Sequence, residues 1–286
     1  MRVRRHTTSH ITLYPLRFEP IYQYRLWGGR RLAELLTAPL PGDGPIGEAW
    51  VLSDRDDHEN HVANRPLKGR TIGQLLEQSA EQLLGKMVRR FRRFPLLLKL
   101  LDAREMLPVQ VHPADSHRDL LPAGETGKTE AWVVMEASPE SRIYASLKPS
   151  TTADDPRRAL TNRAVADHLV GFTPKPGDGA FLPPGTVHAL GGDVVVFEVQ
   201  QNSDVTFRLY DWGHVDAQTS QPRALQVDQA LACIDFGRVR PVWWCPWRRR
   251  PRRRGARHSF KVNTSGCGAC ADNRRLPAAR RVCRAC

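Results

Sequence analysis

The first candidate functional residues in the sequence are Gln110 and His112. They lie in the stretch VQVHP at 109–113, where they alternate with two valines. Because side chains alternate across a β-strand, Gln110 and His112 would share one face and the valines the other. An amide and an imidazole that face a protein core together are candidate ligands for a metal ion.

Two more candidate ligands occur further along the chain. Glu130 in GKTEAW opens a strand-like segment, and His188 lies in PPGTVHAL. Together, two histidines, one glutamate and one amide oxygen suit zinc, with iron or manganese as alternatives. A site with only nitrogen and oxygen ligands and room for substrate would be catalytic rather than structural. Spacing alone does not require a metal, and the alternative is that Gln110 is polar surface and each histidine a hydrogen-bonded structural residue.

The elements that must position these residues are mostly short strands. Strand-like segments recur at short intervals and are separated by turns rich in Pro, Gly, Asn or Asp, which favours an antiparallel sandwich or barrel. They cover residues 12–29, 48–54, 60–64, 94–103, 109–113, 129–137, 142–147, 179–190, 193–200 and 205–211. The spacing of apolar residues predicts helices at 30–36, 71–85, 163–172 and 223–236.

The composition limits the class of protein. With 286 residues, 41% of them hydrophobic, the chain is long enough for one large or two modest domains. It has no apolar run long enough to span a membrane and no secretory leader pattern, so we expect a cytoplasmic protein. The net charge of +13 would suggest a nucleic-acid partner, but residues 1–240 hold 30 basic and 29 acidic residues. The excess charge therefore belongs to the last 46 residues, and the oligomeric state stays open.

Several longer strings carry a family resemblance. They occur in the order FEPIYQYRLWGGRRL, IGEAWVLSD, FPLLLKLLDAREMLPVQVHP, GKTEAW, PPGTVHAL and EVQQNSDVTFRLYDW. Over residues 13–240 the sequence resembles the short bacterial class of type I mannose-6-phosphate isomerases, which are cupins. The resemblance implies a mainly β, jelly-roll cupin fold with a few short helices. It also implies an enzyme that interconverts mannose 6-phosphate and fructose 6-phosphate.

The resemblance implies roles for individual residues as well. One zinc ion per chain would be held by Gln110, His112, Glu130 and His188. The positions that line the active site of the family would be Lys128, Glu198 and Arg208.

These residue types fit the implied chemistry. Aldose–ketose isomerisation moves a proton between C2 and C1 through an enediol(ate), which zinc can stabilise as a Lewis acid. Glu198 is the candidate base, although a histidine or a metal-bound hydroxide is an alternative. Arg208 and Lys128 would supply positive charge to the phosphate or the enediolate. Lys99 in LLLKLL could also bind phosphate, or it could extend from a strand edge into water.

Other prominent residues have structural interpretations. Trp27, Trp50 and Trp132 are expected in the core rather than as a platform for sugar. Asp204 and Asp211, in NSDVTFRLYD, are expected to brace turns and the arginine between them rather than to react.

The chain divides into three segments by composition. We expect residues 1–12 to be disordered, residues 13–240 to form the catalytic cupin, and residues 241–286 to be a mostly disordered Arg- and Cys-rich tail. The tail stands where the family would continue with a smaller cupin-like half, so apolar surface and sheet edges should be exposed without that half.

Three interpretations of the tail compete. CGAC (267–270) and CRAC (283–286) have spacing that can hold a structural zinc ion. The arginine run is also typical of a solvated, disordered tail. Finally, a shifted reading frame in GC-rich coding sequence would produce such an end. The arginines could bind nucleic acid non-specifically, but no specific nucleic-acid partner and no membrane partner are expected.

Two other functions compete with the isomerase. One is a sugar-phosphate-binding cupin that has lost turnover through its altered C-terminus. The other is a basic nucleic-acid-binding protein that acts through the tail, in which case deleting residues 241–286 would abolish its binding.

Overall fold

The computed structural model describes residues 13–36, 39–149, 151–152, 154–161, 164–216, 219–237 and 242–244. The chain divides into a compact unit of residues 1–248 and a second unit of residues 249–286, which lies wholly outside the described residues. The expectations for residues 1–12, for the arginine run and for the CGAC and CRAC motifs therefore also fall outside them. Among the described residues, no helix combines the length and the apolar character needed to cross a membrane.

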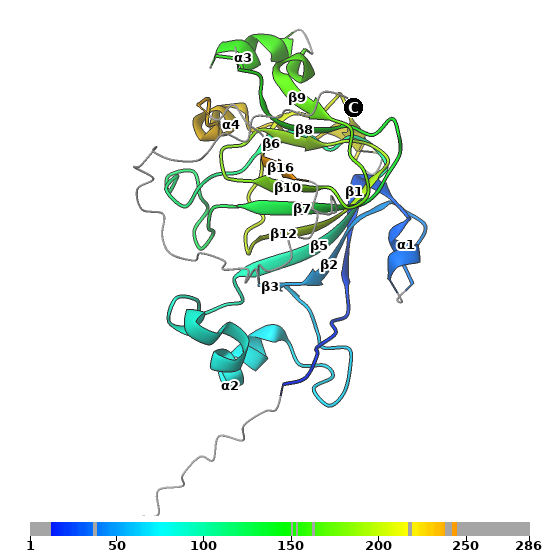
Figure 1. Cartoon of the computed structure of the whole chain (residues 1–286), viewed down its shortest axis with the longest axis vertical. Helices are drawn as coiled ribbons and strands as arrows, with labels where there is room; N and C mark the ends of the chain where they lie inside the picture. The colour runs from blue at the N-terminus through cyan, green and yellow to red at the C-terminus, as the bar shows by residue number, and fades with distance from the viewer. Residues whose placement is uncertain are drawn as a thin grey trace, which may run out of the picture. The chain divides into compact units, whose positions relative to one another are not determined.

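Two antiparallel sheets build the first unit (Figure 1). The larger has seven strands in the order β1 (Ile21–Gly29), β2 (Ile46–Leu52), β5 (Leu96–Ala103), β12 (Val194–Gln201), β7 (Glu130–Ala137), β10 (Gly179–Leu182) and β16 (Val242–Trp244). The smaller has five strands in the order β13 (Phe207–Tyr210), β6 (Val109–Val111), β11 (His188–Leu190), β8 (Ile143–Leu147) and β9 (Leu169–Phe172). Two short hairpins pair β3 (Asp54–Arg55) with β4 (His58–Glu59), and β14 (Val215–Asp216) with β15 (Gln221–Pro222). This mainly β architecture confirms the predicted fold class.

Strand β12 shows how alternation in the sequence builds the larger sheet. It pairs along its whole length with β5 on one side and β7 on the other. Its residues Val194, Val196, Glu198 and Gln200 are all buried, so one face carries both apolar side chains and a carboxylate. The apolar core lies against this face and contains residues from strands of both sheets. Its buried residues are Trp27, Leu101, Ala103, Leu107, Trp132, Val134, Ile143, Ala145, Ala180, Leu182, Leu190, Val194 and Val196. The prediction that Trp27 and Trp132 are core residues is confirmed, and Trp50 is also buried.

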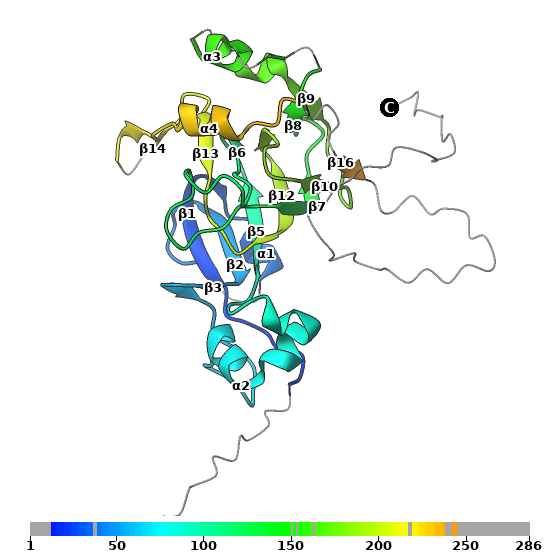
Figure 2. The ribbon, with the colours of Figure 1, turned by 90° about the vertical axis from the view of Figure 1, so that its left-hand side faces the viewer.

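The helices are short and lie outside the sheets (Figures 1 and 2). They are α1 (Leu32–Leu35), α2 (Ile72–Leu84), α3 (Asp154–Thr161) and α4 (Val227–Cys233), with 3₁₀ turns at η1 (Gly85–Arg89) and η2 (Val165–His168). Helix α2 begins at a capping box, in which Thr71 and Gln74 each accept a hydrogen bond from the other's backbone N–H. It ends at Gly85, whose positive φ of 55° suits glycine.

Three predicted elements differ from the structure. The strand segment 179–190 forms two strands in different sheets, β10 and β11, because Pro183 and Pro184 interrupt it. Residues 163–172 were predicted as a helix, but η2 covers only Val165–His168, and Leu169–Phe172 form strand β9 beside β8. Pairing with β8 overrides the helical spacing in so short a segment. The predicted strand at 60–64 is reduced to isolated bridges of His61 and Val62.

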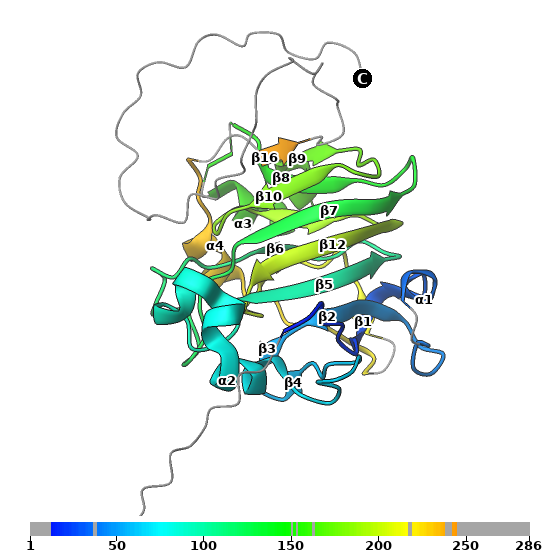
Figure 3. The ribbon, with the colours of Figure 1, turned by 60° about the horizontal axis from the view of Figure 1, so that its bottom comes forward.

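The outer face of the larger sheet is partly covered by Leu32 of α1, which packs with Leu100 and Val195, and is partly exposed, and the sheet extends into the tail segment. Figure 3 shows β5, β12 and β7 side by side on this face. Leu96, Val133, Met135 and Phe181, which lie on β5, β7 and β10, are exposed apolar residues, in line with the expected exposure of apolar surface. Residues Val242–Trp244 pair with β10 as strand β16, although no regular structure was expected beyond residue 240.

Candidate metal centre and substrate cavity

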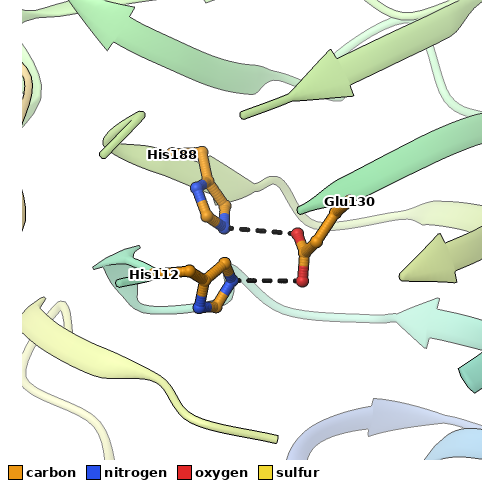
Figure 4. Close-up of side chains that lie close together, drawn as sticks. All are labelled: His112, Glu130 and His188. Carbon is orange, nitrogen blue, oxygen red and sulfur yellow. Dashed lines mark ion pairs between the residues drawn. The ribbon is translucent and has the colours of Figure 1, made fainter. Parts of the chain in front are cut away.

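Three predicted ligands from separate elements converge in the structure. His112 follows β6, Glu130 opens β7 and His188 opens β11, so both sheets contribute. All three are buried, and one potential ligand atom from each lies within 4.8 Å of the others. Figure 4 shows both imidazoles directed at the Glu130 carboxylate. His112 Nε2 lies 3.1 Å from Glu130 Oε1, and His188 Nε2 lies 3.6 Å from Glu130 Oε2.

The backbone fixes which ring nitrogen of each histidine is free to bind a metal. His112 Nδ1 lies 2.9 Å from the carbonyl oxygen of Val205, and His188 Nδ1 lies 2.9 Å from that of Thr186. A carbonyl oxygen only accepts, so each Nδ1 carries the hydrogen and donates it. Each neutral ring therefore turns the lone pair of Nε2 toward Glu130. A second hydrogen bond of this kind is typical of histidines that bind metals.

The charge states of His112, His188 and Glu130 also favour binding of a cation. Burial, assisted by the nearby Lys128 ammonium, lowers the pKa of His112 to about 4. Burial also lowers the pKa of His188. The pKa of Glu130 lies well below its usual value although burial opposes this, chiefly because the Lys128 ammonium stabilises the carboxylate. Near neutral pH the group is thus two neutral imidazoles facing one carboxylate.

Unsatisfied polar atoms test whether the residues fit a metal ion. His112 Nε2 and both Glu130 carboxylate oxygens are buried without a hydrogen-bond partner, although Lys128 Nζ forms an ion pair with Glu130 Oε1 at 2.7 Å. Buried polar atoms without partners are costly, and a divalent cation would satisfy all three. The donor set therefore fits a metal ion.

Gln110, the fourth predicted ligand, lies beside this group. It pairs in register with His188, and its Nε2 lies 3.2 Å from His188 Nε2. The amide nitrogen donates to the lone pair of His188 in this orientation. Turning the amide over would bring its oxygen to the same place and make it available as a ligand.

A cavity of about 450 Å³ opens beside the ligand group. Gln110, Lys128 and Glu130 line it, as do the other predicted site residues Lys99, Glu198 and Arg208. The structure therefore brings all the predicted site residues to one cavity, with His112 and His188 in contact with Glu130 at its wall.

Glu198 has the environment of a poised acid or base. Trp132 Nε1 donates to Glu198 Oε1 at 2.8 Å, which leaves Oε2 toward Lys99 Nζ at 3.9 Å. Burial, together with the negative charge of Glu130, raises the pKa of Glu198 to about 8. Strongly shifted carboxyl groups in a cavity are typical of functional sites.

Lys99 is not a lysine that extends from a strand edge into water. Its side chain is 3% exposed and its Nζ is surrounded by Asp204 at 3.2 Å, Glu48 at 3.6 Å and Glu198 at 3.9 Å. The pKa of Lys99 is raised because these carboxylates outweigh the effect of burial. The ammonium also lies 4.8 Å from the centre of the Trp50 ring.

Sequence reasoning missed several residues of this cavity. Arg25 binds Glu48 with two hydrogen bonds of 3.0 and 3.2 Å, and Arg223 binds Asp211 at 2.8 and 2.6 Å. Asp211 thus braces an arginine, as expected, but its partner is Arg223 rather than Arg208. Glu48 was detectable as a lone acid in the apolar strand segment IGEAW. No local pattern marked Arg223, which directly follows the two-residue strand β15.

Comparisons with known proteins agree with this geometry. The model of the phosphomannose isomerase type I catalytic domain matches residues 16–146. Mannose-6-phosphate isomerase ManA of Bacillus subtilis is 35% identical over 227 residues, which cover 79% of this chain and 69% of the relative. The mannose-6-phosphate isomerase of Streptococcus mutans is 33% identical over 80% of this chain and 71% of its own length. The chain belongs to the type I phosphomannose isomerase family.

The structural comparison supports the same assignment for the fold. A crystal structure of the Bacillus subtilis mannose 6-phosphate isomerase superposes with a TM-score of 0.70 at 32% identity, over 77% of this chain and 68% of that one. A putative mannosephosphate isomerase from Archaeoglobus fulgidus gives 0.62 at 25% identity, with the same coverage. The cupin fold and an isomerase activity, both predicted from the sequence, are thereby confirmed. The phosphomannose isomerase family is metal-dependent, and His112, Glu130 and His188 offer the metal site.

Proposed function

We propose that this isomerase interconverts D-mannose 6-phosphate and D-fructose 6-phosphate, and that it uses one zinc ion and an enediol(ate) intermediate. The ligands would be Gln110, His112, Glu130 and His188. One observation carries the proposal: two neutral imidazoles lie with Nε2 beside the buried Glu130 carboxylate, and His112 Nε2 and both carboxylate oxygens have no hydrogen-bond partner apart from the Lys128 ion pair. A divalent cation between the three side chains would satisfy these atoms, which the single ammonium of Lys128 does not.

Zinc is the metal that this ligand set favours. Neutral imidazoles and a carboxylate suit zinc and leave coordination positions open, as a catalytic site requires. When bound, the ion would act as a Lewis acid that stabilises negative charge on the sugar oxygens. Iron and manganese are the alternatives that metal analysis would distinguish.

We assign the proton transfer to Glu198. Its Oε1 is held by the Trp132 indole, so Oε2 is the oxygen available to take a proton from C2 and return it at C1. A pKa of about 8 allows the carboxyl group to exchange a proton readily near neutral pH. Catalysis of this kind commonly contributes about 10²- to 10⁴-fold in rate.

The cations of the cavity would act at different parts of the substrate. Lys128 pairs with Glu130 and so lies at the metal end, where it would stabilise the oxygens of the enediolate. Arg208 has no ion-pair partner among the described residues, so its guanidinium is available to the phosphoryl group. Lys99 would contact the substrate while its positive charge limits the rise in the pKa of Glu198.

Exchange with solvent tests the proposed route. Isomerisation in D₂O should place deuterium at C1 of the ketose or C2 of the aldose, because a base carries the proton. Glu198→Gln should retain bound metal but lose about 10²-fold or more in kcat, together with the exchange. Glu140→Gln, at an exposed site, is the matched control and should behave as wild type. Full exchange and turnover in Glu198→Gln would assign the base elsewhere.

A further inference from the structure

Arg208 stands out among the charged groups of the cavity. Arg25, Lys99 and Lys128 each lie against at least one carboxylate of the cavity. Arg208 lines the cavity but has no carboxylate partner among the described residues, and its Nε is buried without a hydrogen-bond acceptor. A buried guanidinium atom without an acceptor indicates that an anion from outside the chain completes the site.

Arg223 lies at the same part of the cavity and is rigidly held. Its Nε and Nη2 donate to the two oxygens of Asp211, which leaves Nη1 without a partner among the described residues. Asp211 is buried, so this pair is fixed rather than mobile. A guanidinium oriented in this way presents its remaining N–H groups to the cavity in a fixed direction.

The electrostatics show that these arginines affect one another. Burial lowers the pKa of Arg208, and the positive charges of Arg223 and Arg25 act in the same direction. Arg25 is already engaged by both oxygens of Glu48, whereas Arg208 and Arg223 retain free N–H groups. The Asp211 carboxylate, which binds Arg223 and also acts on Arg208, offsets part of this repulsion, and an anion bound by the free N–H groups would offset the rest.

We propose that Arg223, oriented by Asp211, binds the phosphoryl group of the substrate together with Arg208 and thereby selects sugar phosphates. This inference rests on the proposed function and adds a specificity-determining residue to it. A phosphate dianion has three oxygens that accept planar, paired N–H groups, which guanidinium provides and ammonium does not. Asp211 acts as a positioning residue, because it touches Arg223 and not the cavity.

Kinetics of Arg223→Ala test the proposal on the metal-loaded full chain. The KM for mannose 6-phosphate and the inhibition constant of inorganic phosphate should both rise, by roughly 10- to 100-fold. The value of kcat should change by less than about threefold, and the metal content should be unchanged. Added guanidinium ion should restore part of the lost affinity. Arg157→Ala removes an exposed arginine paired with Asp228 and should leave every constant unchanged.

Two results for Arg223→Ala would overturn the proposal. Unchanged KM and inhibition constant in Arg223→Ala would overturn the proposal, as would a fall in kcat and metal content with an unchanged inhibition constant. If Arg223→Ala does not fold, Arg223→Lys decides, because it keeps the charge and loses the planar fork. A rise of several-fold in both constants supports the proposal, and unchanged constants refute it.

Failure of the proposed function would be recognised separately. A wild-type chain without turnover would show that the isomerase proposal fails. Calorimetric binding of inorganic phosphate to wild type and Arg223→Ala would then decide the role of Arg223. Weaker binding by the variant supports that role, and equal binding overturns it.

Discussion

Replacing Lys99 with methionine should destabilise the protein strongly. The change keeps most of the side-chain volume but removes the ammonium shared by Glu48, Glu198 and Asp204. Removing one partner of a buried ion pair commonly costs 3–5 kcal/mol, roughly, because the other charge stays buried. The Asp204 side chain is 39% exposed, so water screens that pair. We therefore expect a loss of about 3 kcal/mol in the free energy of unfolding at pH 7.5.

The loss should depend on pH in a defined direction. In the wild type, Lys99 helps to hold the pKa values of Glu48 and Asp204 below their usual values. That stabilisation is present above the pKa of the unfolded carboxyl groups and is lost as the pH falls through the folded pKa. In Lys99→Met these carboxyl groups lose the ammonium, although Arg25 still binds Glu48, and they take up protons more readily, so the difference from wild type should shrink between pH 7.5 and pH 5.

Urea denaturation of the metal-free protein at both pH values measures this effect. Lys68→Met, which removes an exposed lysine, is the control and should lie within about 0.5 kcal/mol of wild type. A loss below about 1 kcal/mol for Lys99→Met, or a loss that does not change with pH, would refute the electrostatic reasoning.

Three further predictions concern the metal, the base and a helix. His112→Ala and His188→Ala should each remove bound metal and activity together, as shown by elemental analysis and turnover; metal retained in both variants would contradict the ligand assignment. Since the folded chain keeps a proton on Glu198 up to about pH 8 while the unfolded chain releases it near pH 4.5, stability falls as the pH rises between these values. Metal-free Glu198→Gln should therefore gain stability over wild type at pH 9 but not at pH 4, and equal denaturation midpoints at pH 9 would count against the raised pKa. Thr71→Ala removes the capping box of α2 and should cost about 1 kcal/mol in thermal unfolding, whereas an unchanged melting temperature would show that the cap contributes nothing.

The fold was largely predictable because its strands are marked by local signals. Alternation in VVVFEVQQ and VQV, and the Gly- and Pro-rich turns between strands, are properties of neighbouring residues. Segments whose structure depends on distant partners were harder to predict. Leu169–Phe172 form a strand because β8 lies beside them, and Val242–Trp244 form one because β10 offers an edge. No periodicity within these short segments shows the partner.

The candidate site was predictable where residues that can bind a metal lie on the same face of a predicted strand. Gln110 and His112 share a face, Glu130 and His188 were candidate ligands by residue type, and the resemblance to a known family assigned all four to one metal site. The partners of the cavity cations were not predictable, because they lie far apart in the sequence. The pair of Arg25 with Glu48 depends on the register of β1 and β2, and the unpaired state of Arg208 emerges only from the assembled cavity.

The central claim is that this chain is a zinc-dependent mannose-6-phosphate isomerase. The most direct measurement is a coupled assay of mannose 6-phosphate conversion by the purified full chain, before chelation, after chelation and after return of zinc. We expect turnover that a chelator abolishes and zinc restores. Soluble, metal-loaded protein without turnover would contradict it and would favour a cupin that binds sugar phosphates without catalysis.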